Sequence, residues 1–316
     1  MMQTRRSAAS WLIALGLGLG APAGATAQTN LPSMSVDPNT ASTTLPSTEP
    51  LPADFQTGVS FLDSAVPRSL LRLRYDYDLF NRRPTRAEFL FPADGFHLPE
   101  TRVHSQELNV HVEYGLNEWF STFIESPYKW INPDQNDNVS GIGDLQFGAK
   151  FAGYNTDKLL AAFYLNFGAH TSQHVLTGTG HWSVEPGLLA NYRILDFLTL
   201  EGQVGYWVPI GGTDFAGNVL KYGLGLSYGT SNSTAIGLTP VAEIVGWTVT
   251  SGKEMVVPAP GVFSIEGASG DTIINGCVGL RFTLGQAADV YAGYSRCLTG
   301  QPWFRDMIRV EFRLFY

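Results

Sequence analysis

The stretch Leu71-Arg72-Leu73-Arg74-Tyr75-Asp76-Tyr77-Asp78-Leu79 alternates without interruption between apolar or aromatic residues and charged residues. An α-helix would spread the two kinds around its surface, whereas a β-strand places them on opposite faces. This stretch therefore predicts a strand with one apolar face and one charged face.

The same alternation returns along the chain as far as its last residue, for example over 108–114, 145–151 and 308–316. A strand of about ten residues is long enough to cross a bilayer when it is tilted. Extending the pattern predicts twelve strands, over 69–80, 104–114, 118–128, 141–152, 158–169, 182–193, 197–208, 220–228, 235–247, 271–284, 288–297 and 305–316.

The connections between these strands differ in length in a regular way. Those after the even-numbered strands are short, whereas most of the others are long, including 81–103, 129–140, 170–181 and 248–270. Short turns at one end and long loops at the other are typical of outer-membrane barrels. The sequence thus predicts an all-β fold, a closed antiparallel transmembrane β-barrel of about 12 strands over 67–316, with both termini on the periplasmic side.

A secreted β-sandwich would also alternate, and two further features argue against it. Aromatic residues gather near the strand ends, as in the interfacial girdles of membrane barrels. Glycines on the polar faces would relieve crowding inside a closed barrel. The aromatic residues are Trp119, Phe120, Tyr128, Trp130, Tyr192, Phe197, Tyr206 and Trp247, and the glycines are Gly148, Gly168, Gly187, Gly205, Gly223, Gly225, Gly279 and Gly293.

The composition of the 316-residue chain excludes several classes of protein. Charged residues make up 15% of it, against about 25% in soluble proteins, and hydrophobic residues make up 44%. The net charge of −8 argues against nucleic-acid binding, which requires a basic face. Two cysteines, Cys277 and Cys297, are too few for a disulfide scaffold. We expect both thiols to be unpaired, since a hairpin turning at 285–286 brings Cys277 close to Gly293.

The N-terminus predicts export. Arg5 and Arg6 precede the apolar run 11–19, and an Ala-Thr-Ala pattern at 25–27 completes a secretory signal peptide over 1–27. Residues 28–66 are rich in Pro, Ser and Thr without apolar periodicity, which predicts a flexible periplasmic linker. An exported barrel is expected in the outer membrane of a Gram-negative-type bacterium.

Two segments carry a family resemblance. The run 117–128 (NEWFSTFIESPY), followed by 140–151 (SGIGDLQFGAKF), resembles the MetA-pathway of phenol degradation family of outer-membrane β-barrel transporters. Gly178-Thr179-Gly180, before Glu185 and Pro186, is also similar to that family, and the resemblance covers about 104–193. It implies a channel-type transporter, and the family name suggests small aromatic or hydrophobic compounds as solutes.

The apolar phase of each strand also assigns the residues that face the lumen. Charged groups of both signs interleave there, and they must be paired or hydrated because isolated charges are costly at membrane depth. They could form a polar path for small solutes or an ion-pair network that fills the barrel. The expected lumen residues are Arg72, Arg74, Asp76, Asp78, Glu113, Glu125, Asp144, Lys150, Glu185, Arg193, Glu201, Lys221, Glu243, Arg281, Asp289, Arg309, Glu311 and Arg313.

The loop 170–181 holds the weak candidates for other chemistry. Ser172 and His174 could form the nucleophile and base of a lipid hydrolase, but no partner carboxylate or amide is evident. His170, His174 and His181 could bind a metal ion, but a spacing of four means little outside a helix, and ordinary loop histidines are the better explanation. We therefore expect no enzyme, no metal site and no cofactor.

The first and last strands must pair to close the barrel. A register in which paired residue numbers sum to 385 sets Arg74 against Glu311 and Asp76 against Arg309. Opposite charges directly across a strand pair favour this register over its neighbours. The sequence therefore predicts that Asp76 and Arg309 are neighbours across the seam.

The function expected from these features is porin-like uptake of small solutes through an outer-membrane channel. The alternative is a structural or surface-interaction barrel whose lumen is closed by loops 81–103 and 248–270, and a lipid hydrolase is a weaker one. Expected partners are outer-membrane lipid, the solute and the barrel assembly machinery. The assembly signal would be the terminal alternation Phe312, Leu314 and Tyr316.

Overall fold

The computed structural model describes residues 57–81, 103–134, 137–174, 176–229, 236–259, 262–299 and 304–316. The expected signal peptide, 1–27, and residues 28–56 of the expected linker lie outside the described residues. The strands are β1 (Leu70–Asn81), β2 (Val103–Asn117), β3 (Phe120–Pro133), β4 (Val139–Ile142), β5 (Leu145–Asn155), β6 (Leu159–Ala169), β7 (Trp182–Leu195), β8 (Leu198–Ile210), β9 (Val219–Tyr228), β10 (Ile236–Val249), β11 (Lys253–Ala259), β12 (Val262–Gly267), β13 (Thr272–Leu284), β14 (Ala288–Cys297) and β15 (Asp306–Phe315).

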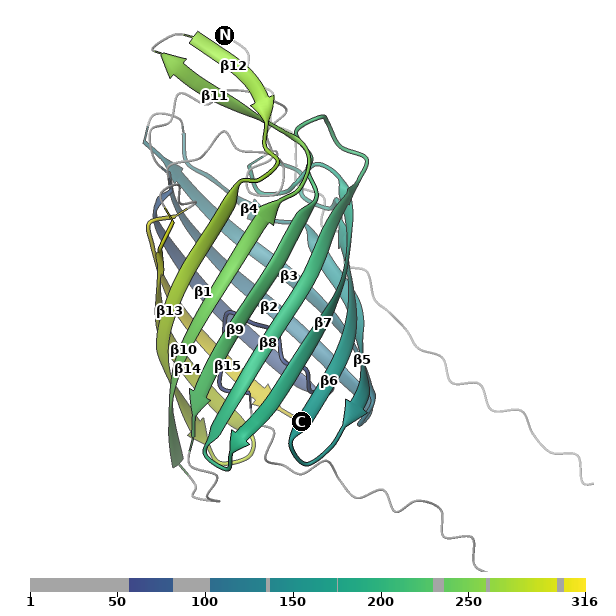
Figure 1. Ribbon diagram of the computed structural model, residues 1–316. Helices are drawn as coiled ribbons and strands as arrows, with labels where there is room; N and C mark the ends of the chain where they lie inside the picture. The colour runs from purple at the N-terminus through teal and green to yellow at the C-terminus, as the bar shows by residue number, and fades with distance from the viewer. Residues whose placement is uncertain are drawn as a thin grey trace, which may run out of the picture. The chain divides into compact units, whose positions relative to one another are not determined.

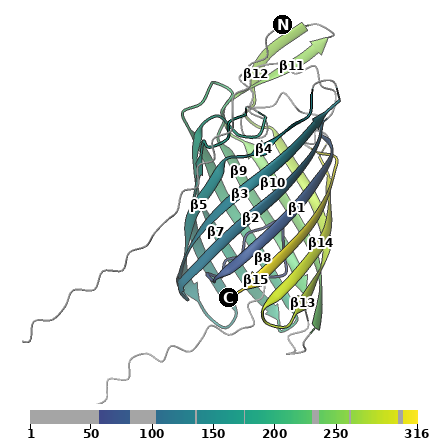
Figure 2. The same ribbon diagram turned by 180° about the vertical axis from the view of Figure 1, so that it is seen from behind.

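All strands except β11 and β12 belong to one closed antiparallel sheet (Figures 1 and 2). Each strand pairs with its neighbours in the chain, and β1 completes the ring by pairing with both β2 and β15. The short β4 and the longer β5 both pair with β3, so together they form one strand of the wall. The described residues thus confirm an all-β, closed, twelve-stranded barrel.

The alternation of the sequence becomes the two faces of this wall. On β1, Leu73 and Tyr75 are each 37% exposed on the outer surface, while the next residue, Asp76, is buried inside. On β9, Leu224 and Leu226 are exposed outside, and Gly223 and Gly225 face the interior. An apolar outer band is what lipid requires, because lipid cannot solvate charged groups.

The two ends of the barrel differ, as the connection lengths predicted. The turns between β7 and β8 and between β13 and β14 lie at the end that holds the C-terminus, which we call the short-turn end (Figure 1). Two expected loops contain additional strands. Much of 129–140 extends β3 and forms the beginning of β4. Within 248–270, β11 and β12 pair as a separate antiparallel two-stranded sheet, in which Lys253 lies opposite Gly267 and Ala259 opposite Val262.

The seam between β1 and β15 has the predicted register. Leu70 is paired with Phe315 and Asp76 with Arg309, so paired numbers sum to 385. Both cysteines are free, as predicted. The hairpin of β13 and β14 is shifted by two residues from the expected register, so that Cys277 lies opposite Ser295 rather than near Gly293.

No helix of sufficient length and hydrophobicity to cross a membrane occurs among the described residues.

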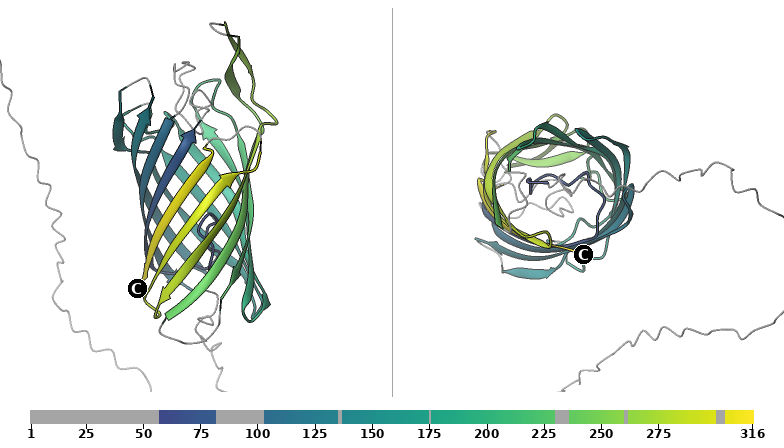
Figure 3. Two further views of the ribbon diagram at one scale, coloured as in Figure 1. Left: turned by 90° about the vertical axis from the view of Figure 1, so that its left-hand side faces the viewer. Right: turned by 90° about the horizontal axis from the view of Figure 1, so that it is seen from below.

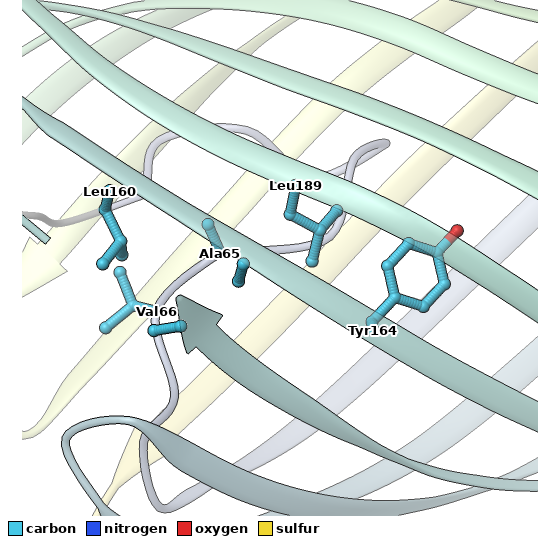
Figure 4. Packing of buried hydrophobic residues seen from close by; sticks show 7 residues of the cluster. Ala65, Val66, Leu160, Tyr164 and Leu189 are labelled. Atoms are coloured by element: carbon cyan, nitrogen blue, oxygen red, sulfur yellow. The ribbon is translucent and has the colours of Figure 1, made fainter. Parts of the chain in front are cut away.

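Residues 57–67, here called the lumen loop, lie inside the barrel (Figure 3). Their side chains pack against inward-facing residues, and Ala65 and Val66 contact a cluster that includes Leu160, Tyr164 and Leu189 (Figure 4). Ala65 is fully buried and Val66 is 8% exposed. The end of the expected linker, residues 57–66, is therefore part of the barrel interior, because the wall supplies partners for its backbone and apolar side chains.

Candidate functional site

The barrel interior brings most of the predicted lumen residues together in three charged networks. The first joins the seam strands β13, β14, β15 and β1. Arg281 binds Asp289 at 2.6 Å and Glu311 at 2.8 Å. Arg309 binds Asp76 through two bonds of 2.7 Å. All these groups are buried, so each charge depends on its partner rather than on bulk water.

A second network connects β1, β2, β3 and β5. Glu125 accepts from Arg72 at 2.8 Å and from Asn109 at 2.7 Å, and its contact with the His111 ring is 2.9 Å. Lys150 pairs with Glu113 at 2.7 Å. This network lies on the side of the ring opposite β10 and β13.

A third, smaller group lies between β6, β7 and β9. Glu185 accepts from the Tyr164 hydroxyl and from the Lys221 ammonium, both at 2.6 Å. The Lys221 side chain is 29% exposed, whereas the Glu185 side chain is 3% exposed. Lys221 is therefore a cationic group that the interior space can reach.

The lumen loop is bound through its backbone. Glu201 accepts from the amides of Gly58 and Val59, at 2.9 and 3.3 Å. Glu243 accepts from the next three amides, those of residues 60, 61 and 62, at 2.9–3.2 Å. Two carboxylates of the wall thus accept hydrogen bonds from five consecutive N–H groups of the loop.

The carbonyl groups of the same segment bind arginines. Arg313 donates to the carbonyl of Thr57 at 2.7 Å, and Arg281 donates to the carbonyls of residues 58 and 59 at 2.8 Å. Arg309 donates to the carbonyl of Ser60 at 2.7 Å and stacks on the Phe61 ring, 3.9 Å from its centroid. The arginines of the seam network therefore have two roles, in ion pairs and in holding the loop.

Glycines on β9 provide the space in which the loop lies. A Cβ atom on Gly225 would approach Val59 Cγ1 to 2.4 Å, and one on Gly223 would approach Leu62 Cδ2 to 2.4 Å. With Val59 and Leu62 in place, a Cβ atom at either position would displace the side chain that it meets. The loop therefore fills the space beside the inward-facing glycines of this strand.

Beside the loop lies a cavity of about 410 Å³ that is lined by both apolar and polar side chains. Its apolar and aromatic lining residues include Phe61, Val245, Trp247, Phe304 and Met307. Its polar and charged lining residues include Gln146, Lys150, Asn166, Glu185, Gln203, Lys221 and the seam arginines Arg309 and Arg313. A space of this volume can hold a small organic molecule with one apolar and one polar side.

Asp63 of the lumen loop also borders this cavity, with its side chain 49% exposed. Burial disfavours its charged form, but the nearby Arg72, Lys150 and His111 outweigh this effect and hold the pKa of the carboxyl below its usual 3.8. The side-chain amide of Gln203 binds Asp63 twice, because its oxygen accepts from the Asp63 backbone N–H and its nitrogen donates to the Asp63 carboxylate. The loop thus contributes a fixed negative charge to the cavity.

Three predicted lumen residues lie away from these networks. Asp78 accepts from the Ser105 hydroxyl at 3.1 Å, and Arg193 follows the buried Asn191 along β7. Asp144 instead binds the loop between β6 and β7, accepting from the amides of Thr171, Ser172 and Thr179 at 2.5–3.1 Å. Because its carboxylate is used to hold this turn, Asp144 is a loop anchor and not a group of the solute space.

The candidates for catalysis and metal binding are arranged for structural roles. The Ser172 hydroxyl bonds the His174 carbonyl at 3.1 Å and the Thr177 hydroxyl at 2.6 Å, while the His174 ring accepts from the Leu176 amide. His170 and His174 are exposed, whereas His181 is buried against Trp207. In the described ranges no group of three or more His, Cys, Asp or Glu side chains could hold a metal ion.

No protein-family model and no curated protein sequence matches the chain, so the resemblance to the MetA-pathway family stays a prediction. Among solved structures, the chain is similar to the COG4313 outer membrane channel from Pseudomonas putida F1. The TM-score is 0.54 at 12% identity, and the match covers 79% of this chain and 96% of that one. The fold is that of an outer-membrane β-barrel.

Two further similar structures have TM-scores below 0.5. NanC porin has a TM-score of 0.48 at 11% identity, covering 78% of this chain and 99% of its own. LpxR from Salmonella typhimurium has a TM-score of 0.44 at 10% identity, covering 78% of this chain and 100% of its own. At these levels neither structure carries an argument about function.

Sequence reasoning missed the lumen loop and its role in the site. Residues 57–67 lack alternation, and their wall partners are about 140–250 positions away in the chain, as for Gly58 with Glu201 and Ser60 with Glu311. The one signal in the sequence was an excess of inward-facing carboxylates and arginines on β8, β10, β13 and β15, which a segment rich in backbone donors and acceptors could satisfy.

Proposed function

We propose that this protein is a passive channel of a bacterial outer membrane that lets small solutes cross through the barrel interior. The observation that carries the proposal is the cavity of about 410 Å³ beside the lumen loop, inside a closed barrel with an apolar outer surface. Polar groups such as Gln146, Asn166 and Lys221 border it and could replace part of the hydration of a passing solute.

The mixed lining of the cavity favours small aromatic or hydrophobic compounds with a polar substituent. Phe61, Trp247 and Phe304 offer apolar faces to a ring, and the amides of Gln146 and Asn166 offer hydrogen bonds to a hydroxyl or a carboxylate. This chemistry agrees with the solute class that the family resemblance implies.

The geometry gives less support to the alternatives. A hydrolase would require a nucleophile held by a base, but the Ser172 hydroxyl bonds the His174 carbonyl and not its ring. A fully closed structural barrel would fill the space beside the lumen loop with side chains, whereas the described residues leave a cavity there.

Single-channel recording of the full chain in a planar bilayer tests the proposal. We expect discrete conductance steps, a sharp loss of permeation with increasing size of neutral polymers, and inhibition of the current by small aromatic alcohols or acids. A matched variant, Trp247→Ala, should weaken that inhibition, whereas Trp119→Ala, at a short turn on the outer surface, should not. A barrel that inserts but carries no current would overturn the proposal.

A further inference from the structure

We infer that the lumen loop, residues 57–67, is a clamped partition of the pore that determines its size limit, and that it stays in place while solutes pass beside it. This inference rests on the proposed channel function. It follows from how the loop is held, what its departure would expose, and where the remaining space lies.

The wall binds most backbone groups of the first part of the loop, residues 57–63. The amides of residues 58–62 bind Glu201 and Glu243, the amide of Asp63 binds Gln203, and the carbonyls of 57–60 bind arginines. Buried backbone groups must be paired, and here charged side chains from four or more strands pair them. A plug that leaves during transport does not need such continuous binding.

Withdrawal of the loop would leave buried carboxylates without their donors. Glu201 and Glu243 are 1% and 5% exposed, and they would lose five N–H bonds between them. Hydrogen bonds to charged groups are stronger than neutral ones, and unpaired buried charges are costly. The seam arginines would also lose their four carbonyl acceptors. Retention of the loop is therefore the favoured state.

The shape of the wall complements the loop in the same way. Gly223 and Gly225 receive Leu62 and Val59 at positions where a Cβ atom would collide with them. Val59 and Leu62 also belong to an apolar cluster with Val241, Val245 and Tyr291. The loop thus completes the packing against β9 and β10, and Val245 and Trp247 of β10 border the space that is left for solutes beside it.

Residues 61–63 of the loop line the space that is left for solutes. Phe61 and Asp63 border the cavity, facing polar groups such as Lys221 and Glu185 across it. The side chains of Asp63 and Lys221 are 49% and 29% exposed. A solute would therefore pass between residues 61–63 and the wall of β5 to β9, and the loop would limit its width.

A reversible disulfide between the loop and the wall tests the inference. In the variant Val59→Cys/Gly225→Cys, with Cys277→Ala and Cys297→Ala in the background, the Val59 Cγ1 methyl that a Cβ atom on residue 225 would meet at 2.4 Å is removed. The two thiols can then occupy the space of that methyl group, within reach of a disulfide bond. We expect the same single-channel conductance and the same polymer size limit in the oxidised and the reduced forms. Leu62→Cys/Gly223→Cys gives a second, independent tether.

Loosening the loop is the complementary experiment. Glu201→Gln/Glu243→Gln weakens the amide clamp and should raise the conductance, the current noise and the polymer size limit. Glu107→Gln, a carboxylate on β2 outside the clamp, serves as the matched control and should change none of these.

The possible results are distinguishable. Current that disappears on oxidation and returns on reduction would show that the loop is a displaceable plug, and would overturn the inference alone. Failure of both cysteine pairs to crosslink would show that the loop does not lie on β9, and would also overturn it. Absence of current through the wild-type barrel would overturn the proposed function, and the inference with it.

Discussion

Asp76 and Arg309 face each other across the seam that closes the barrel, joined by two hydrogen bonds of 2.7 Å. They are 233 positions apart in the chain, and each is 6% exposed. Arg309 also holds the Ser60 carbonyl and covers the Phe61 ring. One ion pair therefore links closure of the barrel to the position of the lumen loop.

Asp76→Asn should destabilise the barrel by about 3 kcal/mol, the lower part of the range for breaking a buried pair, because Arg309 keeps its bonds to the loop. The measurement is the temperature at which the folded, fast-migrating form is lost in detergent. Asp196→Asn, in an exposed turn, is the control and should leave that temperature unchanged. Equal temperatures for both variants would contradict the assigned role of the pair.

Leu224→Arg should destabilise the barrel by about 2–4 kcal/mol, since Leu224 is 55% exposed on the outer surface of β9, where lipid would meet the cation. Gln203→Arg on the adjacent strand points into the cavity and can pair with Asp63, so it should fold normally and reduce conductance. Urea unfolding in lipid vesicles measures the first effect and bilayer recording the second. If both variants lower the free energy of unfolding equally, the assignment of Leu224 to the outer face and Gln203 to the inner face is wrong.

Tyr316→Asp should reduce the yield of barrel assembled in outer membranes far more than Tyr228→Asp. Both side chains are exposed aromatics at the short-turn end, 64% and 53% accessible, so the change in surface polarity is matched. Only Tyr316 ends the chain and completes the alternation with Phe312 and Leu314 that we propose the assembly machinery recognises. Heat-modifiable protein in isolated outer membranes is the readout, and equal yields would exclude a special role for the terminus.

The contribution of Asp63 to the stability of the folded barrel should change with pH only at low pH. Its pKa is held below 3.8, so its pairing with Arg72 stabilises the folded state above that value and is lost as pH falls through the folded pKa. The difference in melting temperature between wild type and Asp63→Asn should be constant from about pH 8 to pH 5 and shrink below about pH 4. A difference that already disappears near pH 6 would refute the assignment.

Asp144→Ala should open the loop between β6 and β7, because its carboxylate accepts three backbone amides and the Thr179 hydroxyl. The local loss should be about 2 kcal/mol or more, given the usual strength of bonds to a charged acceptor. Limited proteolysis should cleave 170–181 in this variant with the rest of the barrel intact. Ser172→Ala, which keeps the anchor, should resist cleavage much longer; the opposite order would show that the serine holds the turn.

The sequence by itself determined the wall of the barrel. Period-two alternation from Leu71 to Tyr316 assigned each strand and its two faces, because a side chain on a strand can point only into the lumen or into lipid. Charge pairing even chose the seam register, since slipping by two residues would set Arg74 against Arg309. These features depend on residues that are neighbours in the chain and, for the seam, on the pairing of the first strand with the last.

Only the tertiary structure decided what fills the lumen. Residues 57–67 carry no periodic signal, and their backbone is held by Glu201, Glu243 and Arg281, which come together only when β8, β9, β10 and β13 pair in the sheet. Likewise Asp144 shares the phase of lumen residues, but a break between β4 and β5 turns it to the loop that follows β6. Alternation gives the direction of a side chain, whereas its partners depend on which distant segments the closed barrel brings within bonding distance.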